Sequence, residues 1–238
     1  MCTVSYISSD TGCIITSNRD EHTSRPIAFR PQEEIINNYR IIYPKDPKAG
    51  GTWFAIREDG VAVVLLNGAF QKHTPFGKYR MSRGLVLLEI ISSDQPDVYF
   101  FNMDLLRIEP FTLILFDGTR LLEMRWDGKS KHWKNLDINE NYIWSSVTLY
   151  GEKATREREH LFNAFLREKK WINENSIVDF HMGHDNDFEN GFVIDRSDGL
   201  KTVSITQAVF NEEELGLSHI DLLNDAEKTT TSCIKLYV

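Results

Sequence analysis

Pairs of short apolar segments that flank turn residues recur along this chain, and they limit the folds open to it. The turns Glu58-Asp59-Gly60 and Asp117-Gly118-Thr119 each separate two such segments, and Gly12 closes a polar turn near the chain start. An Asp-Gly step between apolar runs is a strong hairpin signal. The sequence therefore predicts antiparallel sheets assembled from hairpins. The expected strands are residues 2–8, 12–18, 41–43, 52–57, 61–66, 111–116, 120–126, 142–148, 192–195, 202–209 and 233–238.

Two blocks of predicted helix interrupt these hairpins, so the pattern favours an α+β fold over alternating βαβ units. Ser82 is a candidate N-cap for the first helix. The nearly continuous apolar run at residues 61–66 is typical of a strand covered on both faces, which predicts sheets sandwiched between other layers. We expect one domain over residues 1–238. Helices are expected over residues 82–91, 94–101 and 153–171, and loops over residues 22–50 and 181–190.

Composition limits the partners and the location that we expect. The 238 residues carry a formal net charge of −8, which argues against nucleic acid because phosphate binding depends on clustered Lys and Arg. No apolar run approaches the roughly 20 residues of a membrane span, and residues 1–5 lack the pattern of a secretion signal. We therefore expect a cytoplasmic protein without stable membrane insertion. The chain has three cysteines, an odd number that excludes a framework in which all of them pair.

Cys2 stands out among the cysteines because of its position. Cytosolic aminopeptidase normally removes an initiator Met that precedes a small side chain, which would leave Cys2 with a free α-amino group. That amine titrates near pH ~7.7–8.0 and a thiol near ~8.5, so the amine is suited to take the thiol proton at neutral pH. The alternative is that Cys2 merely begins an edge strand. Cys13 and Cys233 lie in strand-like apolar settings, where a cysteine usually behaves as a small buried hydrophobe.

A set of ordered motifs over about the first 85 residues resembles the NRDE family, which is transport and Golgi organisation 2-like. The family is named for the four residues that stand here as Asn18-Arg19-Asp20-Glu21. Its members typically begin Met-Cys, as this chain does. The further matches are Ser24-Arg25-Pro26, Gly50-Gly51-Thr52-Trp53, Asn67 at a strand end, and Ser82-Arg83-Gly84.

The NRDE family in turn is similar to the N-terminal-nucleophile cysteine hydrolases, the group of bile-salt hydrolases and penicillin V acylases. This resemblance implies a four-layer αββα sandwich of antiparallel sheets. It also implies that Cys2 attacks an acyl carbonyl, that Asp20 holds and polarises the α-amino group, and that Asn67 donates its side-chain amide to the oxyanion. The implied activity is hydrolysis of a non-peptide C–N amide bond through a thioester.

Other residues have supporting roles or depart from the hydrolase pattern. Asn18 and Arg19 are candidates to support the site, and Arg19 is also a candidate to bind an acidic substrate group. Ser17 stands where the hydrolases have an Arg. The pair Ser145-Ser146 stands where they use a second Asn, and Lys201 is the nearest candidate for a late Arg. We keep these residues as substrate-binding or supporting candidates.

Plainer alternatives stay open for two of the catalytic candidates and for the function. Asn67-Gly68 is also a favoured turn pair, and Asp20 is also suited to cap the following loop or to pair with Arg19 or Arg25. We expect a small-molecule amide or acylated substrate, no cofactor and no metal, because the histidines and carboxylates of residues 181–187 match no zinc spacing and indicate a solvated loop. The alternatives are a carrier or trafficking factor that handles haem or lipid, and an interaction protein. The sequence leaves substrate and oligomeric state open.

Overall fold

The computed structural model describes residues 3–9, 11–75, 77–169, 171–183, 186–211, 214–224 and 227–234. Two antiparallel sheets form the centre of this part of the chain. The first sheet has the strand order β10-β1-β2-β11-β12-β13. Its strands are β1 (Thr3–Ser9), β2 (Gly12–His22), β10 (Tyr142–Ser145), β11 (Leu200–Phe210), β12 (Glu214–Asp221) and β13 (Glu227–Ile234).

The second sheet is a meander in which each strand pairs with the next one along the chain, in the order β3 to β9. Hairpin turns such as those at Gly60 and Gly118 join its neighbours, and both glycines have positive φ, as tight turns require. Its strands are β3 (Phe29–Ile36), β4 (Tyr39–Lys45), β5 (Phe54–Arg57), β6 (Ala62–Asn67), β7 (Phe111–Phe116), β8 (Leu121–Trp126) and β9 (Lys131–Leu136).

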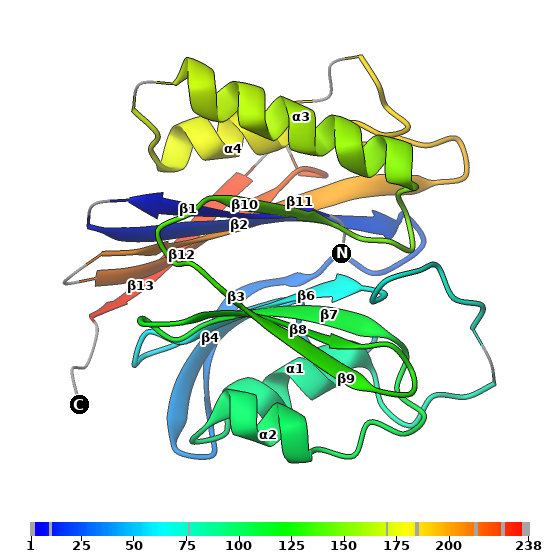
Figure 1. Ribbon diagram of the computed structural model, residues 1–238, viewed down its shortest axis with the longest axis vertical. Coiled ribbons are helices and arrows are strands. Elements are labelled where there is room, and N and C mark those ends of the chain that lie inside the picture. The colour runs from blue at the N-terminus through cyan, green and yellow to red at the C-terminus, as the bar shows by residue number, and fades with distance from the viewer. Residues whose placement is uncertain are drawn as a thin grey trace.

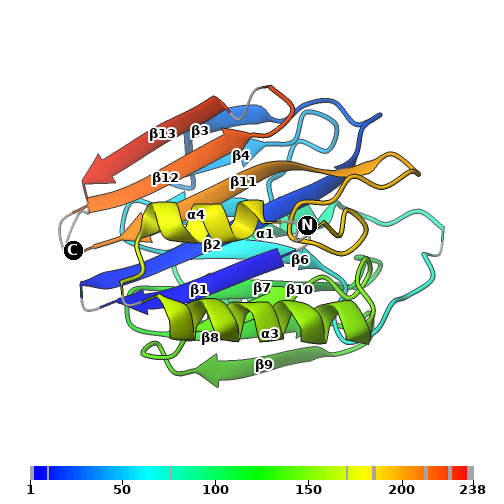
Figure 2. The same ribbon diagram turned by 90° about the horizontal axis from the view of Figure 1, so that it is seen from above.

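Helices cover the outer face of each sheet (Figure 1). The helices α1 (Arg83–Ile91) and α2 (Pro96–Asn102) lie on the second sheet, and α3 (Glu152–Glu168) and α4 (Glu174–Met182) lie on the first. Seen from above, α4 runs over β2 and β11, and α3 runs over β10 beside β1 (Figure 2). The layer order is therefore helix, sheet, sheet, helix, which confirms the expected αββα sandwich. None of the described helices is long and apolar enough to span a membrane.

Each boundary between layers has its own apolar core, as a layered fold requires. Tyr6 and Phe54 belong to the core between the two sheets, Phe100 belongs to the core under α1 and α2, and Phe162 belongs to the core under α3 and α4. Each of these rings is at most 2% exposed. The run at residues 61–66 supplies side chains to both faces of the second sheet, which explains why it lacks alternation.

The expected loop over residues 22–50 is wrong over residues 29–45, because β3 and β4 form a hairpin there; the short strand expected at residues 41–43 is part of β4. The side chains of β3 are mostly exposed, since β3 is the edge strand of its sheet, so its sequence lacks an apolar alternation. Pro31 lies at a register shift between Phe29 and Gln32, a position where a proline costs the sheet little. The strands β9 and β12 and the helix α4 were not anticipated from the sequence either.

Candidate active site

The Asn18–Glu21 motif lies inside β2, which continues to His22, beyond its expected end at residue 18. Successive side chains of a strand point to opposite faces of the sheet. The side chains of Asn18 and Asp20 accordingly contact the helical side of the first sheet, and those of Arg19 and Glu21 face the space between the sheets. One motif thus serves two faces.

Asp20 is held by two hydroxyl groups in a buried environment and is 3% exposed. The hydroxyl of Thr202, its neighbour on β11, donates to Asp20 Oδ1 at 2.6 Å, and the hydroxyl of Tyr150 donates to Oδ2. The Arg158 guanidinium lies 3.4 Å from the centre of the Tyr150 ring. No pairing of Asp20 with Arg19 or Arg25 is found among the described contacts. The sequence offered no signal for Tyr150 or Thr202, which lie far from the motif.

Asn18 links β2 to the end of α4 through hydrogen bonds. Its side-chain amide donates to the carbonyls of His181 and Phe192 at 2.9 and 2.8 Å, and its Oδ1 contacts His181 Nδ1. His181 Nε2 lies 2.7 Å from the Ser5 hydroxyl. Burial, with the nearby Arg158 charge as a second cause, lowers the pKa of His181 to about 3. His181 is therefore neutral and buried, which corrects the expected solvated loop; His184 and Asp185 of that expected loop lie outside the described residues.

Arg19 lines the opposite face of β2 and is almost completely buried. Its guanidinium donates to Asp46 at 2.8 Å and stacks over the Trp53 ring with 4.5 Å between the guanidinium carbon and the ring centre. Glu21 lies 3.4 Å from Arg19, and Arg25 donates to the same Asp46 oxygen at 2.7 Å. Burial lowers the pKa of Arg19 although both acidic neighbours raise it. The arginine thus stays cationic in a largely desolvated place.

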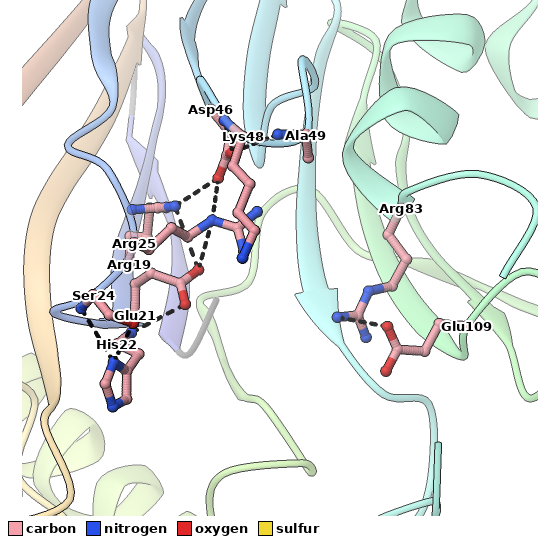
Figure 3. A network of polar contacts seen from close by, with 10 residues as sticks. All are labelled: Arg19, Glu21, His22, Ser24, Arg25, Asp46, Lys48, Ala49, Arg83 and Glu109. Carbon is pink, nitrogen blue, oxygen red and sulfur yellow. Dashed lines mark hydrogen bonds and ion pairs between the residues drawn. The ribbon is translucent and has the colours of Figure 1, made fainter. Parts of the chain in front are cut away.

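A cavity of ≈530 Å³ lies beside Arg19 and reaches across to the second sheet. Its far wall includes Arg83, which forms an ion pair with Glu109 at 3.1 Å. Figure 3 shows Arg19, Arg25 and Asp46 on one side of the view and Arg83 with Glu109 on the other. Burial lowers the pKa of Arg83 against the opposing effect of Glu109. Asn67 and Trp53 also line this cavity.

Asn67 ends β6 at the junction of two cavities, because it lines both the ≈530 Å³ cavity and a smaller one of ≈130 Å³. Its backbone carbonyl accepts a hydrogen bond from the Ser146 hydroxyl at 2.9 Å. Its side-chain amide has no hydrogen-bond partner within the part of the chain that the structure describes. Gly68, which follows it, has positive φ, so the turn expected from the Asn-Gly pair is present as well.

The first described residue of β1 brings these elements together. Thr3 pairs with Asn18 on one side and with Ser145 on the other, and Ser146, next to Ser145, binds Asn67. Arg158 donates to the Thr3 hydroxyl at 2.7 Å. Cys2 itself lies outside the described residues.

Lys201 is placed apart from the cavity. It lies opposite Glu21 in the sheet register, but its ammonium donates to Asp195 at 2.8 Å and its side chain is 37% exposed. Besides Arg19, the cationic groups of the cavity wall are Arg80 and the arginines of the matched Ser24-Arg25-Pro26 and Ser82-Arg83-Gly84 motifs. Those motifs were the available signal, although no role was predicted for their arginines.

The αββα layers define a protein with the N-terminal-nucleophile hydrolase fold. More specifically, the chain belongs to the Transport and Golgi organisation 2 family, whose model matches residues 1–198. This confirms the resemblance that was stated from the motifs. No curated protein matches the sequence.

Solved structures support the fold assignment. An N-acylethanolamine-hydrolyzing acid amidase ortholog from Caenorhabditis elegans is similar with a TM-score of 0.62 and 12% identity, over 87% of this chain and 92% of that one. A cysteine-to-alanine mutant of the conjugated bile acid hydrolase from Clostridium perfringens is similar with a TM-score of 0.61 and 12% identity, over 100% and 97% of the two chains. At these identities the likeness establishes the fold alone.

Proposed function

We propose that this chain is an amidase that uses Cys2, after removal of Met1, to hydrolyse a C–N bond of a small or acylated amide. The observation that carries this proposal is the position of Thr3, the residue bonded to Cys2. Thr3 pairs with Asn18 and Ser145, and through Ser146 this end of the sheet is connected to Asn67. The start of β1 thus adjoins both the Asp20 strand and the cavity junction.

The proposed reaction begins with proton transfer from the Cys2 thiol to its own α-amino group. The thiolate attacks the amide carbonyl, and the Asn67 side-chain N–H donates to the oxyanion that forms. The ammonium returns its proton to the leaving amine as the C–N bond breaks. Water then hydrolyses the thioester, which releases the acid and restores the thiol. Asp20, held by Tyr150 and Thr202, orients the α-amino group during these steps.

Two features favour Asn67 as the oxyanion donor. Its side-chain amide is uncommitted among the described residues, whereas the amide of Asn18 is fully used by the carbonyls of His181 and Phe192. An oxyanion donor must be available for the substrate and fixed in position. The Ser146 hydroxyl supplies the fixing contact, since it binds the backbone of Asn67 at 2.9 Å.

The names of the similar structures favour the same chemistry. One is an amidase and the other a conjugated bile acid hydrolase, and both share the fold of this chain. A carrier that handles haem or lipid in the same cavity is the alternative. It predicts binding without turnover.

The test is intact-mass analysis of protein expressed without an N-terminal tag, before and after brief alkylation with iodoacetamide at neutral pH. Peptide mapping assigns the label, and the buried Cys13 serves as an internal reference. The matched control carries an N-terminal tag, which turns the Cys2 nitrogen into an amide. We expect loss of Met1, rapid labelling of Cys2 and much slower labelling in the control. A retained Met1, or equal rates in both proteins, overturns the nucleophile proposal and leaves the carrier.

A further inference from the structure

The cavity between the sheets has a cationic wall in an otherwise acidic protein. Its described lining includes four arginines and three carboxylates, a formal excess of one positive charge, whereas the whole chain has a net charge of −8. The charged residues are Arg19, Arg25, Arg80, Arg83, Glu21, Asp46 and Glu109.

Asp46 and Glu21 pair with Arg19 and Arg25, and Glu109 pairs with Arg83, so the formal excess belongs to Arg80, an exposed residue that donates to the Asp104 carbonyl. A single Asp46 oxygen accepts from both Arg19 and Arg25, and Glu21 lies at the longer distance of 3.4 Å from both. The side chains of Arg19 and Arg83 are 5% and 17% exposed. A desolvated cation gains most from a further anion, and a guanidinium binds a carboxylate through two parallel hydrogen bonds.

Trp53 supplies an independent observation. It lines the same cavity, is 3% exposed and lies under the Arg19 guanidinium. Its buried indole N–H has no hydrogen-bond acceptor among the residues that the structure describes. The indole N–H is a donor only, and leaving a buried donor unpaired is costly.

We propose that the wall formed by Arg19 and Trp53, with Arg83 opposite, binds an oxyanion group of the substrate, so that the substrate is an amide with a negative charge such as a carboxylate. The bound oxygens accept hydrogen bonds from the Trp53 indole and from Arg19 donors that the acidic residues leave unused. That the bound anion belongs to a substrate rests on the proposed amidase function. The binding of the anion itself does not require turnover.

The first test compares iodoacetate with iodoacetamide as alkylating agents of Cys2. The two reagents share size and leaving group and differ in charge. For each sample we take the ratio of the iodoacetate rate to the iodoacetamide rate at Cys2. We expect this ratio to be about tenfold higher in the protein than in a peptide with the same first residues. A tenfold difference corresponds to an interaction free energy of about 1.4 kcal/mol. A ratio equal to that of the peptide overturns the proposal.

Single variants locate the effect. Arg19→Gln and Arg83→Gln remove one cation each, and Trp53→Phe keeps an aromatic ring but removes the N–H. Each is expected to lower the ratio at Cys2 toward the peptide value. The matched controls are Arg120→Gln and Trp133→Phe, since these side chains are 52% and 61% exposed and lie outside the cavity lining. Equal ratios in cavity and control variants contradict the proposal.

A binding measurement separates this inference from the amidase proposal. Calorimetric titration compares N-acetylglycine with N-acetylglycinamide, which differ in the carboxylate alone, on the Cys2→Ser protein. We expect the anionic probe to bind at least about tenfold more tightly, with the preference lost in Arg83→Gln even if Arg19→Gln does not fold. If iodoacetamide labels Cys2 slowly but the protein still prefers the anionic probe, only the amidase proposal is contradicted. Equal affinities for the two probes defeat the anion site.

Discussion

Four consecutive residues of β2 connect two faces of one sheet. Asn18 and Asp20 bind groups of the helical layer, including His181 and Tyr150. Arg19, which lies between them, binds Asp46 in the space between the sheets. The strict alternation of a strand forces this division, because no residue of the motif can be shifted without exchanging the faces. The motif therefore supplies buried contacts to the helical side of the sheet through Asn18 and Asp20, and part of the cavity wall through Arg19.

Asn67→Ala tests the oxyanion contact. Loss of one such donor typically lowers kcat by about 10²–10³-fold. We expect a loss of that size on the amide that is turned over fastest in a substrate screen. The alkylation of Cys2 by iodoacetamide forms no oxyanion, so its rate should stay unchanged. An unchanged kcat would rule out Asn67 as the donor, and a parallel loss of alkylation would indicate a general disturbance of the site.

Short motifs in the sequence selected the catalytic candidates Asp20 and Asn67, whose roles stay predictions. They were selected because their motifs match in order along the chain; Asp20 lies two residues after Asn18, the partner of Thr3, and Asn67 accepts a hydrogen bond from Ser146. Tyr150 and Thr202 were not anticipated, because each is a single common residue whose contact with Asp20 spans 130 or 182 positions. Such contacts depend on the pairing of distant strands, which local patterns do not encode.

At the scale of elements, two glycines set the distance between α1 and the second sheet. A Cβ on Gly84 would lie 2.6 Å from the carbonyl oxygen of Thr52, and a Cβ on Gly51 would lie 2.4 Å from the carbonyl carbon of Gly84. The backbones of the two motifs thus touch directly. This contact, with the Ser82 N-cap, places Arg83 at the far wall of the cavity.

Gly84→Ala should therefore destabilise the protein. The new methyl group must push two backbone segments apart, and overpacking of this kind typically costs about 1–3 kcal/mol. We expect a loss in that range in urea unfolding at pH 7. Gly216→Ala on β12 is the matched control, because no described heavy atom lies within 4 Å of the position that its methyl group would occupy. Equal stability of the two variants would contradict the packing argument.

The contact between α4 and β2 makes stability depend on pH. The pKa of His181 is about 3 in the folded protein because of burial, against about 6.5 in an unfolded chain. The unfolded state therefore binds more protons between these values. The stability from neutral His181 is complete above pH 6.5 and is lost as the pH falls, by about 2 kcal/mol at pH 5.

His181→Gln should remove this dependence. We expect the variant to be less stable than the native protein at pH 7 but to lose about 2 kcal/mol less between pH 7 and pH 5 in urea unfolding. The control is His160→Gln, at an exposed position on α3. If His181→Gln does not fold, His219→Gln tests the same effect, since burial lowers the pKa of His219 to about 4. Parallel pH curves for the native and variant proteins would contradict the argument.

Some elements were predictable and others were not, for a physical reason. The predicted segments that correspond to β5, β6, β7 and β8 are apolar and are flanked by clear turn residues. The sequence therefore indicated both the strand character and the approximate ends of each segment. In contrast, β9 (KHWKNL) is an edge strand with no fully buried side chain, and its lysines suggested a solvated surface. Edge strands gain their structure from pairing with a neighbour, and their own side chains carry little of that information.

At the scale of the whole molecule, Arg158 links the outer helical layer to the start of β1. Although it is 1% exposed, no carboxylate lies within ion-pair distance among the described residues. Its guanidinium instead donates to the carbonyls of Asn190 and Gly191 at 3.0 and 2.5 Å and to the Thr3 hydroxyl at 2.7 Å, and it stacks on Tyr150. One side chain therefore joins α3, a loop, β1 and the partner of Asp20.

Arg158→Met should disturb stability and site together, because the apolar side chain fills the space but leaves these acceptors unpaired. Each buried group left without its partner costs about 1–3 kcal/mol, so we expect a loss of about 3 kcal/mol or more in urea unfolding. Arg158→Lys, which restores the charge and part of the hydrogen bonding, should recover part of it. Arg156→Met on the same helix, at a side chain that is 77% exposed, should change little. If Arg158 also fixes the chain beside Cys2, iodoacetamide will label Cys2 more slowly in folded Arg158→Met than in Arg158→Lys. A stability loss with equal labelling would limit Arg158 to holding the layers together, and no loss at all would contradict its proposed place between them.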